Sequence, residues 1–186
     1  SHAGRPADAD TMTVQQLLAA YIEACKMRGR AANTIRGYEG CAALLNNELG
    51  AVPISKLNRI RVETAYANIA QMTTKKGKPM RRGTIAYAHR VLKAACNYAV
   101  ESKLMQDNPC AKAILPQETE PFHASVIKPE DARKILEALP EYDEQLYLVV
   151  LLCVVYGLRR GEALGLRWAD IDFKNDTITV SGQYTY

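Results

Sequence analysis

The sequence contains no apolar run long enough to cross a membrane. Its longest such run, residues 146–156, has eleven apolar residues, whereas a membrane-spanning helix needs about 18. The N-terminus shows no secretory signal pattern, and residues 1–11 are interpreted as a tag remnant or a disordered lead. We therefore expect no association with a membrane.

Paired cysteine spacings are lacking as well. The sequence has five cysteines, Cys25, Cys41, Cys96, Cys110 and Cys153. Four of the five lie within apolar helical patterns. A disulfide framework or a structural zinc site would need paired spacings. The cysteines are therefore interpreted as reduced core residues of a cytoplasmic protein.

Charge is distributed unevenly along the chain. Residues 1–115 hold 17 Lys and Arg against 8 Asp and Glu, a net charge of +9, whereas residues 116–186 hold 7 against 12, a net charge of −5. A basic helical region favours a polyanion as its partner, because lysine and arginine that neutralise phosphates release counterions. The second half does not share this bias.

Apolar residues in the first half recur at the spacing of one helical face. The pattern predicts four helices, at about residues 14–28, 34–49, 59–72 and 84–103. Ile60 is expected on the buried side of the third. Short connections between such helices are typical of a compact bundle.

The fourth helix ends at Asn108-Pro109, because the residue before a proline is disfavoured in a helix. The chain then has little periodicity and two further prolines, which is typical of a linker. The predicted domains are a helical domain at 12–110, an interdomain linker at 111–127 and a second domain at 128–186.

Three groups of polar residues in the first half are candidates for contact with a polyanion. Residues 28–34 form a basic turn, and residues 75–82 carry five positive charges that cannot all be paired locally. Arg90, Lys93 and Asn97 form a polar stripe on the fourth helix. The stripe could lie in a major groove and reach base edges. It could equally be the solvated face of an ordinary bundle, and the loop an ordinary surface loop.

The second half is predicted to combine helices with a hairpin. Pro129 suits the first turn of a helix that Pro140 ends, and residues 143–156 form a second helix. That helix is apolar on all sides, so we expect it to be buried. Two short strands, around residues 171–173 and 177–180, are expected to form the hairpin.

The segment that follows the apolar helix, residues 157–172, reads GLRRGEALGLRWADID. At the edge of a core an arginine can be held in place and partly desolvated, and its rigid five-donor fork suits a carboxylate or a phosphate. The ordinary alternative is a helix end at Gly157 followed by Arg159 and Glu162 as a solvated pair. Taken alone, the segment favours the ordinary alternative, because most such pairs lie on the surface.

The chain resembles the tyrosine recombinase family, also called phage integrases. The resemblance rests on GLRRGE followed by LRWADID, and on the basic four-helix domain before them, which ends in NPCA at residues 108–111. The similarity extends over nearly the whole chain from about residue 12. It implies a mainly α fold: a four-helix SAM-like core-binding bundle, followed by a truncated α+β catalytic domain with two or three helices and a β-hairpin.

The resemblance implies a site-specific recombinase that cleaves and rejoins DNA strands through a phosphotyrosine intermediate. Arg159 would contact the scissile phosphate and Glu162 would support it, while Trp168 and Asp170 resemble framework residues. The resemblance also implies a homotetramer on a double-stranded DNA recombination site, with no metal and no other cofactor. The candidate DNA-binding residues are Arg30, Thr34, Arg36, Lys75, Lys76, Lys78, Arg81, Arg82, Arg90, Lys93 and Asn97.

Members of the family also use a lysine, a histidine beside a second arginine, a further histidine or tryptophan, and a nucleophilic tyrosine. None of these can be located in the 186 residues, and Tyr184 and Tyr186 lie too close to Arg159 in sequence to be the nucleophile. We therefore expect this polypeptide to bind DNA without cutting it. The alternatives are a non-catalytic helical DNA-binding protein and a helical scaffold that binds another protein.

Overall fold

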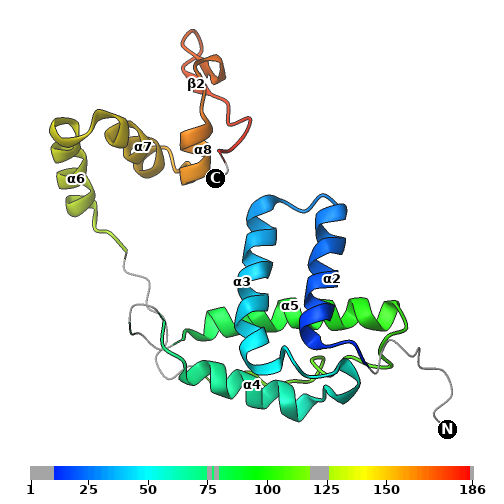
Figure 1. The fold of residues 1–186 in the computed structure, drawn as a ribbon. Helices are drawn as coiled ribbons and strands as arrows, with labels where there is room; N and C mark the ends of the chain where they lie inside the picture. The colour runs from blue at the N-terminus through cyan, green and yellow to red at the C-terminus, as the bar shows by residue number, and fades with distance from the viewer. Residues whose placement is uncertain (1–10, 75–76, 78–79, 118–125, 185–186) are drawn as a thin grey trace. The chain divides into compact units, whose positions relative to one another are not determined.

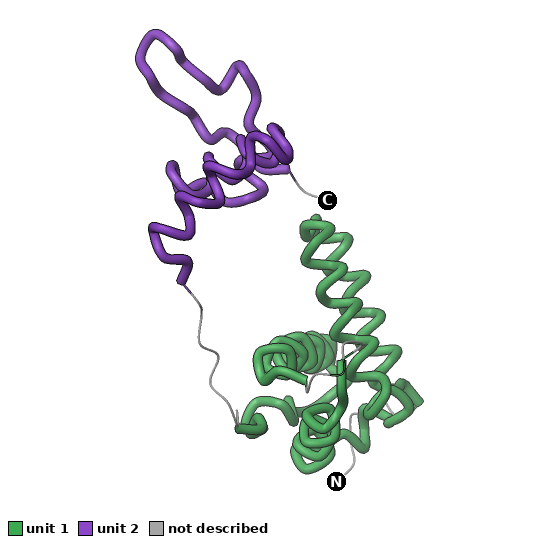
Figure 2. Tube along the Cα trace, turned by 90° about the vertical axis from the view of Figure 1, so that its left-hand side faces the viewer, with its two compact units in different colours: residues 1–121 green, residues 122–186 purple. Residues whose placement is uncertain are grey.

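The protein divides into two compact units, Ser1–Pro121 and Phe122–Tyr186 (Figure 2). The computed structural model describes residues 11–74, 77, 80–117 and 126–184, and each unit is treated by itself. The division falls inside the segment 111–127. The predicted lead, residues 1–11, lies outside the described residues apart from Thr11.

The first unit is a helical bundle. In Figure 1, α2 and α3 run side by side in opposite directions, and α5 crosses both of them. The fourth helix, α4, packs against α3 and α5. The elements are α2 Val14–Met27, α3 Ala32–Leu49, the 3-10 turn η1 Ile54–Lys56, α4 Arg59–Gln71 and α5 Arg82–Glu101.

Local capping starts two of these helices where the sequence allows it. Thr13 Oγ1 accepts the Gln16 N–H (3.3 Å) while Gln16 Oε1 accepts the Thr13 N–H (2.9 Å), so two backbone donors at the start of α2 are satisfied. Asn58 Oδ1 accepts the Arg61 N–H at the start of α4 (2.9 Å). Gly29 has φ +72°, a conformation that favours glycine, and lies in the turn between α2 and α3.

A single apolar core holds the first unit together. Each of its four helices contributes fully buried side chains, among them Leu17, Leu45, Tyr66 and Leu92. The expectation for Ile60 was wrong, because its side chain is 75% exposed. The buried residues of α4 instead follow helical spacing from Val62 to Ile69, and residues 59–61 are exposed.

The chain that follows α5 is hydrogen-bonded back onto the first unit. Asn108 Nδ2 donates to the Lys93 carbonyl (2.9 Å). Further along, Glu63 Oε1 accepts the Ile114 N–H (2.8 Å), and Arg82 Nε donates to the Pro116 carbonyl (3.1 Å). The part of the predicted linker up to residue 116 is therefore fastened to α4 and α5.

The second unit begins with two helices, α6 and α7, that pack against each other, and a small hairpin follows α8 (Figure 1). Its strands pair with Ile171 opposite Ile178 and Asp172 opposite Thr177. The predicted helix end at Pro140 was wrong, since α6 continues through this proline to Tyr142. The elements are α6 Pro129–Tyr142, α7 Glu144–Val155, α8 Arg160–Gly165, η2 Trp168–Asp170, β1 Ile171–Asp172 and β2 Thr177–Ile178.

The apolar helix α7 is not buried, contrary to the expectation from its sequence. None of its residues is fully enclosed, and the Leu148 side chain is 52% exposed. Among the described residues its main packing partners are α6 and α8, which together cover only part of its circumference. No helix in the described part of the chain has both the length and the apolar character needed to cross a membrane.

Candidate functional site

Arg159 and Glu162 form a hydrogen-bonded ion pair at the start of α8. Gly157, with φ +70°, turns the chain after α7, and Arg159 then precedes the first helical residue of α8 in an extended conformation. Glu162 Oε2 accepts the Arg159 backbone N–H (2.8 Å), and Glu162 Oε1 accepts from Arg159 Nη1 (3.0 Å). One carboxylate therefore holds both the backbone and the guanidinium of the same residue.

The two side chains of this pair differ in exposure. Glu162 is 22% exposed, whereas Arg159 is 84% exposed, so the arginine is solvated, as in the ordinary alternative, and not desolvated at the edge of a core. The Arg159 backbone N–H, and then its guanidinium, lower the pKa of Glu162. The carboxylate is therefore charged at neutral pH, and an exposed, oriented guanidinium can accept an anion on its open side.

A second arginine–carboxylate pair follows eight residues later and was missed by the sequence analysis. Asp170, only 9% exposed, accepts from Arg167 Nε and Nη2 (both 3.3 Å) and from the Arg167 backbone N–H (2.9 Å). Ser181 Oγ donates to Asp170 Oδ1 (2.8 Å). These contacts, that of Arg167 first, lower the pKa of Asp170 to about 2. The repeated i, i+3 spacing was the available signal for Arg167, but Ser181 had none.

The segment after β2 lies against α8. The Thr179 N–H donates to the Asp170 carbonyl (2.8 Å) and the Tyr184 N–H to the Gly161 carbonyl (2.7 Å). A Cβ at Gly165 would lie only 2.8 Å from the Tyr184 backbone nitrogen. Residues 179–184 therefore hold the helix that Arg159 directly precedes, and this close approach requires glycine in α8.

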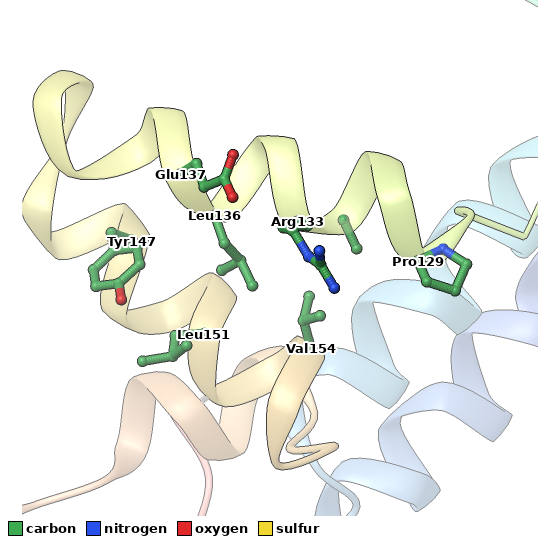
Figure 3. A pocket seen from close by; sticks show the side chains of 8 residues that line it. Pro129, Arg133, Leu136, Glu137, Tyr147, Leu151 and Val154 are labelled. Carbon is green, nitrogen blue, oxygen red and sulfur yellow. The ribbon is translucent and has the colours of Figure 1, made fainter.

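An apolar groove lies between α6 and α7, away from this pair. It measures about 490 Å³, and Figure 3 shows Leu136, Leu151 and Val154 lining it, with Arg133 beside them. Neither Arg159 nor Glu162 lines it. In the described residues no cluster of three or more His, Cys, Asp or Glu could hold a metal ion.

The structure exposes most of the described candidates for DNA contact in the first unit. Arg30 lies in the turn between α2 and α3, while Thr34 and Arg36 lie in the first turns of α3. Arg36 donates to the Asn33 side chain. Arg81 precedes α5 and is exposed. Lys75, Lys76 and Lys78 lie outside the described residues.

The candidate DNA-binding residues on α5 differ in their contacts within the protein. Arg82 donates to the Pro116 carbonyl, and Asn97 Oδ1 accepts from Asn108 Nδ2 (2.6 Å), so both have structural partners. Lys93 is half-exposed. Arg90 is exposed and its guanidinium lies over the Tyr87 ring, 5.3 Å from the centroid.

Three half-buried tyrosines, Tyr21, Tyr38 and Tyr87, lie in a row beside Arg90. They were not among the site residues predicted from the sequence. The Tyr21 and Tyr38 ring centroids are 6.0 Å apart, and those of Tyr38 and Tyr87 are 6.4 Å apart. The rings thus link α2, α3 and α5, with Arg90 at one end. Burial raises the pKa of Tyr87, so its hydroxyl is neutral at physiological pH. Their spacing along three separate helices offered no common sequence signal.

The sequence is similar to those of known proteins. Residues 125–185 match the model of the phage integrase family. A tyrosine recombinase XerC-like protein of Caldanaerobacter subterraneus subsp. tengcongensis is 31% identical over 185 residues, which is 95% of this chain and 45% of that protein.

Solved structures show the same fold. The Tn1549 transposon integrase in complex with transposon right end DNA has a TM-score of 0.73 and 28% identity, covering 92% of this chain and 53% of that one. A lambda integrase dimer bound to a COC′ core site has a TM-score of 0.72 and 20% identity, covering 87% of this chain and 56% of that one. The second likeness concerns the fold alone.

The bundle, the α8 motif and these matches define a DNA integrase fold, as the sequence predicted. The chain belongs to the tyrosine recombinase, or phage integrase, family. It spans about half the length of the relatives that it matches.

Proposed function

We propose that this chain is part of a site-specific recombinase that cleaves and rejoins duplex DNA through a phosphotyrosine intermediate. The observation that carries the proposal is the Arg159–Glu162 pair. Its carboxylate holds the arginine through two contacts, while 84% of the arginine side chain stays accessible. An oriented and accessible guanidinium is suited to bind a phosphodiester.

The chemistry assigns the two residues different tasks. When a tyrosine oxygen attacks phosphorus, negative charge accumulates on the non-bridging oxygens while the bond to the leaving deoxyribose oxygen breaks. A guanidinium that is already oriented stabilises this charge without reorganising. Arg159 would supply the guanidinium. Glu162 would keep it in place by accepting hydrogen bonds from the Arg159 backbone N–H and Nη1.

Binding of the duplex is assigned to the first unit. Residues 1–115 have a net charge of +9, and Arg30, Arg36, Arg81 and Arg90 are exposed on the helical bundle. The likeness to the Tn1549 integrase, solved in complex with DNA, supports the same partner here. We also propose that the full-length protein forms a homotetramer on its site, in the cytoplasm.

The nucleophile is assigned to none of the described tyrosines. Tyr184, the described tyrosine that follows the α8 motif, has its backbone bonded to Gly161 within the segment that holds α8. We therefore propose that the 186-residue chain binds DNA without cutting it.

Two measurements on this chain test the proposal. Fluorescence anisotropy with a labelled duplex should give an affinity that falls steeply as salt rises, because several phosphates are neutralised. Incubation with a nicked duplex, followed by a denaturing gel, should show no covalent protein–DNA product. Absence of DNA binding at low salt would favour the protein-binding scaffold. A covalent product would reject the assignment of the nucleophile.

A further inference from the structure

The Tyr87 side chain on α5 packs so closely against α3 that only glycine fits at position 37. A Cβ at Gly37 on α3 would lie 2.7 Å from the Tyr87 hydroxyl oxygen and 3.3 Å from its Cε1. The phenol therefore rests against the bare Cα of Gly37. On another side, the Tyr38 ring lies 6.4 Å away between centroids. Two residues of α3 thus restrict where this α5 side chain can stand.

Arg90 rests on the ring that is fixed in this way. Its guanidinium carbon lies 5.3 Å from the Tyr87 centroid, within the range of an attractive cation–π contact. Arg90 is exposed, and an arginine side chain with free rotamers loses conformational entropy when it is immobilised. The ring therefore reduces the freedom that Arg90 must give up when it contacts a ligand.

We propose that Tyr87 is a positioning residue for DNA binding: seated on Gly37, it holds the Arg90 guanidinium ready to contact a phosphate of the duplex. The inference rests on the proposed function, and it adds residues that the sequence did not connect with the site. Tyr87 acts through Arg90 and does not itself contact the DNA. Its ring is the essential part, and its hydroxyl is dispensable.

The expected effect is modest and measurable. Exposed cation–π contacts contribute about 0.5–1 kcal/mol, which corresponds to a roughly two- to fivefold change in affinity. Replacement of Tyr87 by Leu should weaken DNA binding by about this factor, while Tyr87→Phe should retain wild-type affinity. Arg90→Ala should weaken binding and reduce the magnitude of the salt slope by about 1.

A double-mutant cycle separates positioning from direct contact. If Tyr87 acts through Arg90, Tyr87→Leu should cause no further loss in an Arg90→Ala background. Independent, additive losses from the two substitutions would overturn the proposal. Tyr98→Leu is the matched control, because Tyr98 is half-buried on the same helix and its ring lies against Tyr21, with centroids 6.1 Å apart.

Gly37→Ala offers a second route that keeps Tyr87 itself. Alanine is the better helix former, but its Cβ must displace the Tyr87 hydroxyl, so affinity should fall as it does in Tyr87→Leu while thermal unfolding stays cooperative. Adding Tyr87→Phe removes the hydroxyl that the new Cβ meets, and this double variant should recover affinity.

The outcomes are distinguishable on the 186-residue chain with a labelled mixed-sequence duplex. Wild-type chain that fails to bind at low salt rejects the proposed DNA binding, and the inference with it. Binding by the wild type with unchanged affinity in both Tyr87→Leu and Gly37→Ala overturns the inference alone. Loss in both variants, with recovery in the Gly37→Ala/Tyr87→Phe pair, supports it.

Discussion

Glu162 accepts hydrogen bonds from both the backbone N–H and the guanidinium of Arg159, at 2.8 and 3.0 Å. The carboxylate is mostly covered, whereas the arginine is open to solvent. The pair therefore combines an oriented donor with access for a ligand, which neither a buried ion pair nor an unrestrained surface arginine provides.

Replacing Arg159 by Ala in the full-length recombinase should abolish most cleavage while leaving site binding nearly intact. The lost donor acts on charge that develops in the transition state, and removing such a donor costs about 2.7–4 kcal/mol, or roughly a hundred- to a thousandfold in rate. Single-turnover cleavage and duplex affinity are measured in parallel. Arg160→Ala is the neighbouring control, and equal cleavage by Arg159→Ala and wild type would reject the assignment.

Replacing Gly165 by Ala should loosen the segment that holds α8. The new Cβ would lie 2.8 Å from the Tyr184 backbone nitrogen, so residues 183–184 must move. Amide hydrogen exchange of Tyr184, whose N–H donates to the Gly161 carbonyl, should become faster. Gly182→Ala is the control, because a Cβ there meets nothing within 4 Å. Unchanged exchange in the Gly165 variant would show that this contact is dispensable.

The hydrogen bonds of Asp170 with Arg167 and Ser181 should stop stabilising the fold only in strong acid. Its pKa is lowered from 3.8 to about 2 in the folded protein, chiefly by Arg167. A lowered carboxyl pKa stabilises the fold above the unfolded value, and this stabilisation declines as pH falls from about 3.8 through 2. Asp170→Asn should therefore narrow the difference in unfolding midpoint between pH 6 and pH 2, followed by circular dichroism. An equal pH dependence in wild type and variant would contradict this.

The basic loop should contribute to affinity without regard to DNA sequence. Replacing its five basic residues together by alanine should weaken binding to every duplex and reduce the salt dependence of the affinity. These residues are Lys75, Lys76, Lys78, Arg81 and Arg82. A single Arg82→Ala variant shows how much of the loss comes from the hydrogen bond between Arg82 and the Pro116 carbonyl, and not from lost phosphate contacts. Unchanged affinity of the fivefold variant at low salt would identify the loop as ordinary solvated surface.

Local patterns were sufficient for several features of this protein. The four helices of the bundle follow from apolar periodicity and caps such as that of Thr13 with Gln16. The Arg159–Glu162 contact also follows from sequence, because residues at i and i+3 around the start of a helix are neighbours whatever surrounds them. Such features depend on backbone geometry over a few residues.

Contacts between distant segments could not be read in this way. Arg82 reaches Pro116, 34 residues away, and Tyr87 is seated on Gly37 because two helices cross there. Helical periodicity marks α7 as apolar but does not say which elements cover it, so its exposure was mispredicted. The sequence by itself determined the helices of the bundle, the family motif and the local Arg159–Glu162 pair. Only the tertiary structure decided which helix faces meet, because that depends on how separate elements pack.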